Sequence, residues 1–277
     1  SADQNVPGPP VAVIAIAPSL MQGETPRPSG ALKGLPVLLK DNIETRDMPT
    51  TAGSLALADN APGRDAPLVA RLRDAGAVIL GKTNLSEWAN IRSSDSISGW
   101  SAIGGQTRNP YDPARTPCGS SSGSAVAVAI GLAPVAIGTE TDGSITCPAS
   151  VNGVVGFKPS VGLVSRTHVV PISHSQDTAG PMATTVEDAA IILSVIAGSD
   201  PADPATVEAD ARKVDYRAAL DAGSLRGARI GVMRFLLSSY SAETRAEFER
   251  ALTALRAAGA EVVEIEQAPT DLRAIGG

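Results

Sequence analysis

The sequence has few of the residues that build metal centres, disulfide scaffolds and aromatic cores. It holds two cysteines, Cys118 and Cys147, too few for a disulfide-rich scaffold or an all-cysteine zinc site. Its two histidines, His168 and His174, are too few for most histidine-based metal sites. We therefore expect no metal and no cofactor. Because Phe, Trp and Tyr together make up only 3% of the chain, its core must be built from aliphatic side chains.

Long apolar runs and basic clusters are also missing. No stretch reaches the roughly 20 apolar residues of a membrane-spanning helix, so no membrane contact is expected. No secretory leader is visible, but the chain begins at Ser1 rather than Met. We expect a soluble protein, either cytoplasmic or secreted after leader removal. The net charge of −6 and the lack of a Lys/Arg cluster argue against a nucleic-acid partner.

Apolar runs alternate with helical patterns along most of the chain, which is typical of an α/β fold. One helix begins at Pro67, a residue favoured in the first turn, and ends before Gly76. Another has Thr185 and Asp188 at the spacing of a capping box. The expected strands are 11–16, 35–39, 77–80, 134–137, 229–233 and 260–265, and the expected helices are 67–75, 124–130, 185–197 and 241–258.

Two clusters of small polar residues, Gly119–Ser124 and Thr139–Ile145, are separated by an Ala/Val-rich segment. Ser/Gly runs are usually flexible linkers. Here both clusters adjoin apolar segments without charged residues, so we expect ordered loops joined by a buried helix and strand. Thr141–Ser144 offers successive backbone N–H groups beside a hydroxyl, the composition of an anion-binding nest.

A serine nucleophile needs a base to accept its proton. His168 and His174 lie outside any Gly-rich turn and no Gly-x-Ser-x-Gly motif is present, although a Ser-His-Asp triad stays open. Lys40 is the other candidate base. It follows the apolar run 36–39, and burial would lower its pKa. The plainer interpretation is a lysine at a strand end that extends into water.

Several motifs together resemble the amidase signature family. They occur in the family's order and span residues 11–265, and three such motifs in order are far more specific than one Ser/Gly run. The resemblance implies an α/β fold with a mixed, twisted β-sheet flanked by α-helices on both faces. It also implies a single domain over residues 1–277, lacking the family's N-terminal helices and C-terminal part. The motifs are Gly34–Asn42, Gly119–Ala125, Gly138–Ile145, Gly153–Pro159, Gly162–Arg166 and Ser175–Pro181.

The resemblance implies a Ser–cis-Ser–Lys triad and an acyl-enzyme. Matched by motif, the nucleophile is Ser144, the bridging serine is Ser120 and the base is Lys40. The cis peptide bond of the family precedes the bridging serine and would be Gly119–Ser120. Ser121 and Ser122 are rival positions for that serine, but the spacing to the nucleophile favours Ser120.

Other residues take supporting roles by the same resemblance. The oxyanion would be held by the backbone of Thr141, Asp142, Gly143 and Ser144. Supporting positions are Ser121, Asp177 and Arg166, with Asp177 and Arg166 expected to brace the serine loops. Cys118 and Cys147 are either small buried fillers or a disulfide, because the two loops should be close. For His174, Leu85, Trp88, Ile97 and Trp100, core packing and pocket lining both stay open.

The implied function is hydrolysis of carboxamides, either small amides or C-terminal peptide amides. Gly105–Pro110 and Cys118–Gly123 are most similar to the peptide-amidase branch of the family. The alternative is the amidase subunit of a glutamyl/aspartyl-tRNA amidotransferase, and a third is a non-catalytic scaffold, which the joint presence of Lys40, Ser120 and Ser144 argues against. The expected partners are the amide substrate and a C-terminal fragment of the same enzyme, without which the 277 residues are not expected to be a stable, active enzyme.

Overall fold

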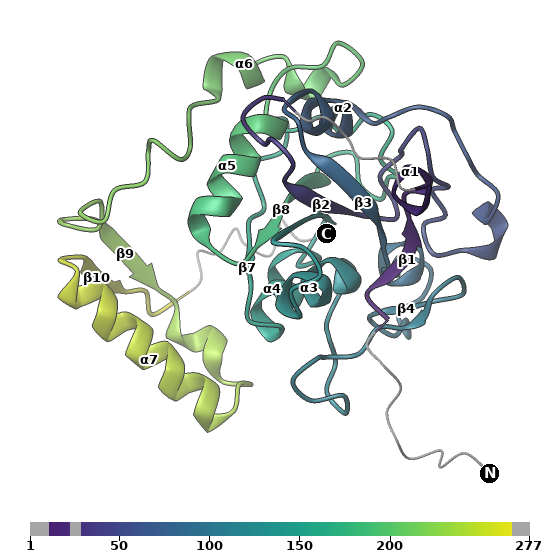
Figure 1. Cartoon of the computed structure of the whole chain (residues 1–277). Helices are drawn as coiled ribbons and strands as arrows, with labels where there is room; N and C mark the ends of the chain where they lie inside the picture. Colours follow the sequence, from purple (N-terminus) through teal and green to yellow (C-terminus); the bar gives the residue numbers. More distant parts are fainter. Residues whose placement is uncertain (1–10, 23–28, 268–277) are drawn as a thin grey trace. The chain divides into compact units, whose positions relative to one another are not determined.

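The structure, a computed structural model, describes residues 11–22 and 29–267 (Figure 1). The chain forms two compact units, Ser1–Ala218 and Ala219–Gly277, and each is described by itself. No helix among the described residues is both long and apolar enough to cross a lipid bilayer.

The first unit is built on a mixed six-stranded sheet with the order β1-β3-β2-β6-β8-β7. Strand β2 pairs in parallel with β3 and β6, whereas β1, β7 and β8 pair antiparallel to their neighbours. The strands are β1 Val13–Ile16, β2 Pro36–Lys40, β3 Val78–Thr83, β6 Val135–Glu140, β7 Val155–Gly156 and β8 Thr178–Ala183.

Helices cover both faces of this sheet (Figure 1). Because side chains alternate along a strand, Val37 and Leu39 of β2 face one side and Leu38 faces the other. Val37 and Leu39 pack in one apolar cluster with α2 (Pro67–Asp74) and α5 (Val186–Ile196). Leu38 packs in another with α3 (Ser122–Ala129). The predicted α/β fold with helices on both faces is confirmed.

Short elements complete the first unit, and a small βαβ motif forms the second. Strands β9 and β10 of the second unit pair in parallel, as their separation by a helix predicts. The short elements are α1 Pro18–Met21, β4 Trp100–Ser101, β5 Gly105–Gln106, α4 Thr146–Val151 and α6 Ala209–Arg212, with 3₁₀ turns at Leu55–Leu57, Glu87–Asn90, Pro204–Thr206 and Arg234–Leu237; the second unit holds β9 Arg229–Val232, α7 Ala242–Ala257 and β10 Glu261–Glu264.

Local sequence signals account for several of these boundaries. Pro67 occupies the first turn of α2. The Thr185 hydroxyl accepts the backbone N–H of Asp188 at 3.0 Å and caps α5. Strands β3 and β6 run three residues beyond their predicted ends, to Thr83 and Glu140, because their polar final residues are also buried.

Candidate active site

The parallel pairing of β2 and β6 brings Lys40 to the serine loop. Leu39 lies opposite Ile137, and the carboxyl ends of parallel strands meet at one edge of a sheet. Lys40, the last residue of β2, is fully buried. Its amine lies 2.7 Å from Ser120 Oγ, 2.8 Å from Thr139 Oγ1 and 3.1 Å from the Thr139 carbonyl oxygen. Two residues that are 80 positions apart are therefore in direct contact.

The protonation state of Lys40 follows from this environment. Burial lowers its pKa from 10.5 to about 7, although the Asp177 and Glu140 carboxylates act in the opposite direction. A neutral amine has two N–H donors and one lone pair. When one N–H donates to the Thr139 carbonyl and the other to the Thr139 hydroxyl, the lone pair faces the Ser120 hydroxyl. Neutral Lys40 can then accept a hydrogen bond, and a proton, from Ser120.

Three consecutive serines at the start of α3 have different partners. Within the described residues, Ser120 alone of the three contacts Lys40. The Ser121 hydroxyl donates to the Thr139 carbonyl at 3.0 Å, and the Ser121 backbone N–H donates to the Ser144 carbonyl at 3.1 Å. The Ser122 hydroxyl donates to the Cys118 carbonyl. These contacts favour Ser120 over its rivals and place Ser121 between the two loops. The bond between Gly119 and Ser120 is cis.

Ser144 lies in the loop between β6 and α4, beside a cavity of about 480 Å³. Ser120, Thr139 and Thr141 line the same cavity. Within the described part of the chain, the backbone N–H groups of residues 142–144 donate to no acceptor. The loop turns at Gly143, whose φ of 75° is a conformation that favours glycine. The two serine loops therefore meet at one cavity, and one of them has backbone donors to offer.

Glu140 anchors the loop that carries Ser144. Its carboxylate accepts the backbone N–H groups of Ile145 at 2.6 Å and Thr146 at 2.8 Å. Lys158 lies 3.9 Å from this carboxylate and donates to the Thr141 carbonyl at 2.7 Å. The loop is thus held at both ends by charged side chains.

The two expected bracing residues differ in what they contact. One carboxylate oxygen of Asp177 accepts the Thr141 hydroxyl at 2.5 Å, and the other accepts the backbone N–H groups of Ile172 and Ser173. Asp177 therefore touches the nucleophile loop. Arg166 does not touch either serine loop within the described residues.

Instead, Arg166 forms an ion pair with Asp203 at 2.6 Å and donates to the His174 carbonyl. The expectation that Arg166 braces the serine loops is corrected on this point, because its guanidinium is taken up by Asp203. The same contact lowers the pKa of the Asp203 carboxyl. Both partners line the cavity, so Arg166 shapes its wall rather than the serine loops.

The remaining candidate residues fall partly outside the cavity. His174 is an exposed residue of the cavity lining, and His168 lies 3.6 Å from Glu44. Neither imidazole bonds to Ser120 or Ser144 within the described residues. Leu85 is fully buried, whereas Arg92 stacks over Trp100 at 5.1 Å. Of the segment that holds Trp88, Trp100 and Ile97, Ala89 is the residue that lines the cavity.

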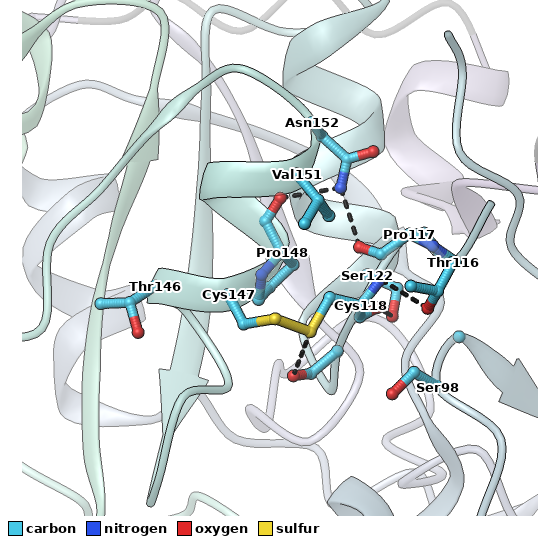
Figure 2. Close-up of a disulfide and its surroundings, with 12 residues drawn as sticks. Ser98, Thr116, Pro117, Cys118, Ser122, Thr146, Cys147, Pro148, Val151 and Asn152 are labelled. Atoms are coloured by element: carbon cyan, nitrogen blue, oxygen red, sulfur yellow. Dashed lines mark hydrogen bonds between the residues drawn. A yellow bond between two sulfur atoms is a disulfide. The ribbon is translucent and has the colours of Figure 1, made fainter. Parts of the chain in front are cut away.

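Cys118 and Cys147 form a disulfide with a Cα–Cα distance of 5.9 Å (Figure 2). It joins the segment before α3 to helix α4. Beside it, the amide of Asn152 donates to the Pro117 carbonyl at 2.9 Å and to the Pro148 carbonyl at 2.7 Å (Figure 2). Of the two alternatives for these cysteines, the structure shows the disulfide.

A second buried lysine, Lys82, lies near the site and was not predicted. Its amine donates to the Asp41 carboxylate at 2.9 Å and to the Thr50 hydroxyl at 3.0 Å. Burial lowers the pKa of Lys82, and Asp41 opposes this effect. A signal was present, because Lys82 and Lys40 each end an apolar run and precede a polar residue and an asparagine. Asp41 directly follows Lys40, so this ion pair fixes the backbone on which Lys40 stands.

Comparisons with known proteins agree with this geometry. The Amidase family model matches residues 10–274. A probable amidase of Arabidopsis thaliana, At4g34880, is 54% identical over 73% of this chain and 40% of its own length. A glutamyl-tRNA(Gln) amidotransferase subunit of Acidothermus cellulolyticus is 49% identical over 85% of this chain and 46% of its own. The native peptide amidase of Stenotrophomonas maltophilia has a TM-score of 0.85 and 58% identity over 92% of this chain and 54% of its own.

Fold and site together define an α/β protein with a buried lysine–serine contact at the edge of a mixed sheet. The chain belongs to the amidase family, as the sequence motifs predicted. It spans about half the length of the relatives that it matches.

Proposed function

We propose that this protein hydrolyses carboxamides, either small amides or C-terminal peptide amides. Ser144 is the nucleophile, Ser120 relays its proton and Lys40 is the base. The observation that carries the proposal is the 2.7 Å contact between Ser120 and a fully buried lysine whose pKa is lowered to about 7. A lysine in this state is a base at neutral pH, which an exposed lysine is not.

In the first step, Ser144 Oγ attacks the amide carbonyl carbon. Its proton passes to Ser120 as the Ser120 proton passes to neutral Lys40, which becomes an ammonium. The carbonyl oxygen acquires a negative charge. The N–H groups of residues 142–144, which have no acceptor within the described residues, are the donors that would hold it together with Thr141 of the same loop.

In the second step, the tetrahedral intermediate collapses and the C–N bond breaks. Lys40 returns a proton through Ser120 to the leaving nitrogen, which departs as ammonia or an amine. The acyl group remains as an ester on Ser144. Water then attacks this ester with Lys40, again neutral, as the base, and the carboxylic acid leaves. Each step uses side chains and backbone of this chain.

The cavity supports an acyl group with apolar substituents. Its wall includes a run of apolar residues, Val169–Ile172, and the polar groups near it are paired with one another, as Arg166 is with Asp203. The relative that is a peptide amidase shares 58% identity, compared with 49% for the amidotransferase subunit. Both points favour peptide amides over glutamine.

The second candidate is the amidase subunit of a tRNA-dependent amidotransferase. The observation that favours it is the 49% identity to such a subunit over 85% of the chain. The two candidates differ in what they require. An amidotransferase releases ammonia from glutamine for a charged tRNA, whereas a peptide amidase needs no nucleic acid.

The test is ammonia release from a panel of peptide amides, aryl amides and glutamine, with and without charged tRNA. We expect turnover of peptide amides, at least about 10³-fold lower in Ser144→Ala and Lys40→Ala. Ser150→Ala is the matched control, because Ser150 is an exposed serine of α4. Activity that survives in Ser144→Ala would refute the site, and turnover of glutamine that depends on tRNA would select the second candidate.

A further inference from the structure

The disulfide joins the two loops to which the proposed reaction assigns its serines. Cys118 precedes Ser120 by two residues, and Cys147 follows Ser144 by three. Their Cα atoms are 5.9 Å apart (Figure 2). We propose that this disulfide positions Ser120 and Ser144 relative to each other, so that its reduction lowers turnover far more than substrate affinity. This inference rests on the proposed function.

Each cysteine is bonded into its own loop, so the link acts on the serines rather than on loose chain ends. The Cys118 carbonyl accepts the Ser122 hydroxyl, and its N–H donates to the Thr116 hydroxyl at 3.0 Å. Cys118 has a φ of 52°, a conformation that L-residues rarely adopt without restraint. The N–H of Cys147 donates to the carbonyl of Gly143, the residue before Ser144, at 2.8 Å.

Other contacts between the loops are non-covalent and remain after reduction. The N–H of Ser121 donates to the Ser144 carbonyl, and Asn152 bonds to the Pro117 carbonyl. These hydrogen bonds keep the loops together, so reduction should not unfold the site. They restrain it less tightly than a covalent bond, and a displacement of about 1 Å between reacting groups costs up to about 10²-fold in rate.

The disulfide is open to a reductant, because both cysteines are only half-buried. A dithiol such as dithiothreitol reduces it by two electrons. The S–S bond breaks, Cys118 and Cys147 each gain a proton as thiols, and the dithiol is oxidised to its cyclic disulfide. A disulfide-forming oxidant reverses the exchange. Turnover should therefore follow the redox state of one pair of cysteines.

The test compares oxidised, dithiothreitol-reduced and reoxidised protein, with thiol titration reporting the state of the cysteines. We expect reduction to lower kcat for a peptide amide by about tenfold, KM to change by less than about twofold, and reoxidation to restore kcat. The variant Cys118→Ser/Cys147→Ser should resemble the reduced protein and be insensitive to dithiothreitol.

A purely structural role is distinguished by Leu193→Ala, a truncation in the core on α5, away from the serine loops. This variant loses thermal stability but should keep kcat at temperatures well below unfolding. A reduced protein with two free thiols and unchanged kcat would overturn the inference alone, as would a loss of kcat that dithiothreitol also causes in the double serine variant. An oxidised protein without amidase activity would overturn the proposed function and this inference with it.

Discussion

Lys40 shows how burial can turn an ordinary residue into a base. In water a lysine is charged at neutral pH, but here the side chain is fully buried, and a neutral amine needs acceptors for only two N–H groups. The fold supplies three polar partner atoms from only two residues, Ser120 and Thr139. The site therefore suits the neutral amine, which is the form that the proposed mechanism requires.

This charge state predicts how activity depends on pH. Because the pKa of Lys40 is lowered to about 7, the neutral base is lost as the pH falls through 7. We expect kcat/KM for a peptide amide to be flat above about pH 8 and to fall about tenfold per pH unit below about pH 6. The measurement is kcat/KM from about pH 5 to about pH 9 in buffers of constant ionic strength.

Two variants check the origin of this profile. The Asp177 carboxylate raises the pKa of Lys40, so Asp177→Asn should move the acidic limb to lower pH, whatever it does to the maximal rate. Lys40→Arg keeps a positive charge at every pH tested and should be inactive throughout. A profile without an acidic limb would contradict the assignment of Lys40 as the base.

At the residue scale, the sequence predicted the chemistry better than the contacts. Lys40, Ser120 and Ser144 come from motifs, and the structure brings the first two together. Thr139 was missed, because its main role uses a backbone carbonyl, which carries no sequence signal. The partner of Arg166 was also mispredicted, since Asp203 lies 37 residues further along the chain and only the folded chain brings it near.

At the scale of elements, the nucleophile loop depends on the strand before it and the helix after it. Glu140 ends β6 and accepts the first N–H groups of α4. A buried carboxylate that accepts backbone N–H groups at a helix start is a strong, charge-assisted contact. It fixes the direction in which the chain leaves Ser144.

Glu140→Ala should therefore disturb both stability and rate. It leaves two N–H donors of α4 without an acceptor, at a cost of about 2–4 kcal/mol in the free energy of unfolding. We expect kcat to fall at least about tenfold, because the loop that carries Ser144 loses its anchor. Urea denaturation and steady-state kinetics measure the two effects.

Thr185→Ala provides the matched control, since Thr185 caps α5 in the same way but far along the chain from the serine loops. It should cost about 1 kcal/mol and leave kcat unchanged. An equal loss of kcat in both variants would mean that general stability, rather than loop geometry, sets the rate.

The sequence predicted elements with a clear apolar period and missed those without one. Strand β2 and helices α2, α3 and α5 lie close to their predicted ranges. Strand β8, Thr178–Ala183, was read only as part of a motif, because Gly180 and Pro181 interrupt its strand pattern. Helix α4 was missed because Pro148 lies within its six residues.

At the scale of the whole molecule, the site exists because of strand order. The base and the serine loops belong to segments far apart in the chain, and β2 and β6 become neighbours only when β3 pairs on the other side of β2. No short motif encodes that order. The family resemblance supplied it here, whereas composition and periodicity alone indicated only an α/β fold.

The two compact units should differ in local stability. Strands β2 and β6 lie within the sheet, and nearly all of their residues are buried. In the second unit, the buried hydrophobic side chains among the described residues are Val232, Leu252 and Ala260. A two-stranded β ladder with so small an apolar face has little to protect it from local opening.

We therefore expect backbone amides of β9 and β10 to exchange with deuterium at least about 100-fold faster than those of β2 and β6. Hydrogen–deuterium exchange of the 277-residue chain, followed by mass spectrometry under native conditions, measures this. Leu252→Ala should speed exchange further in β9, α7 and β10, because Leu252 is the largest buried side chain among the described residues of that unit. Equal protection of the two sets of strands would show instead that the chain opens as one cooperative unit.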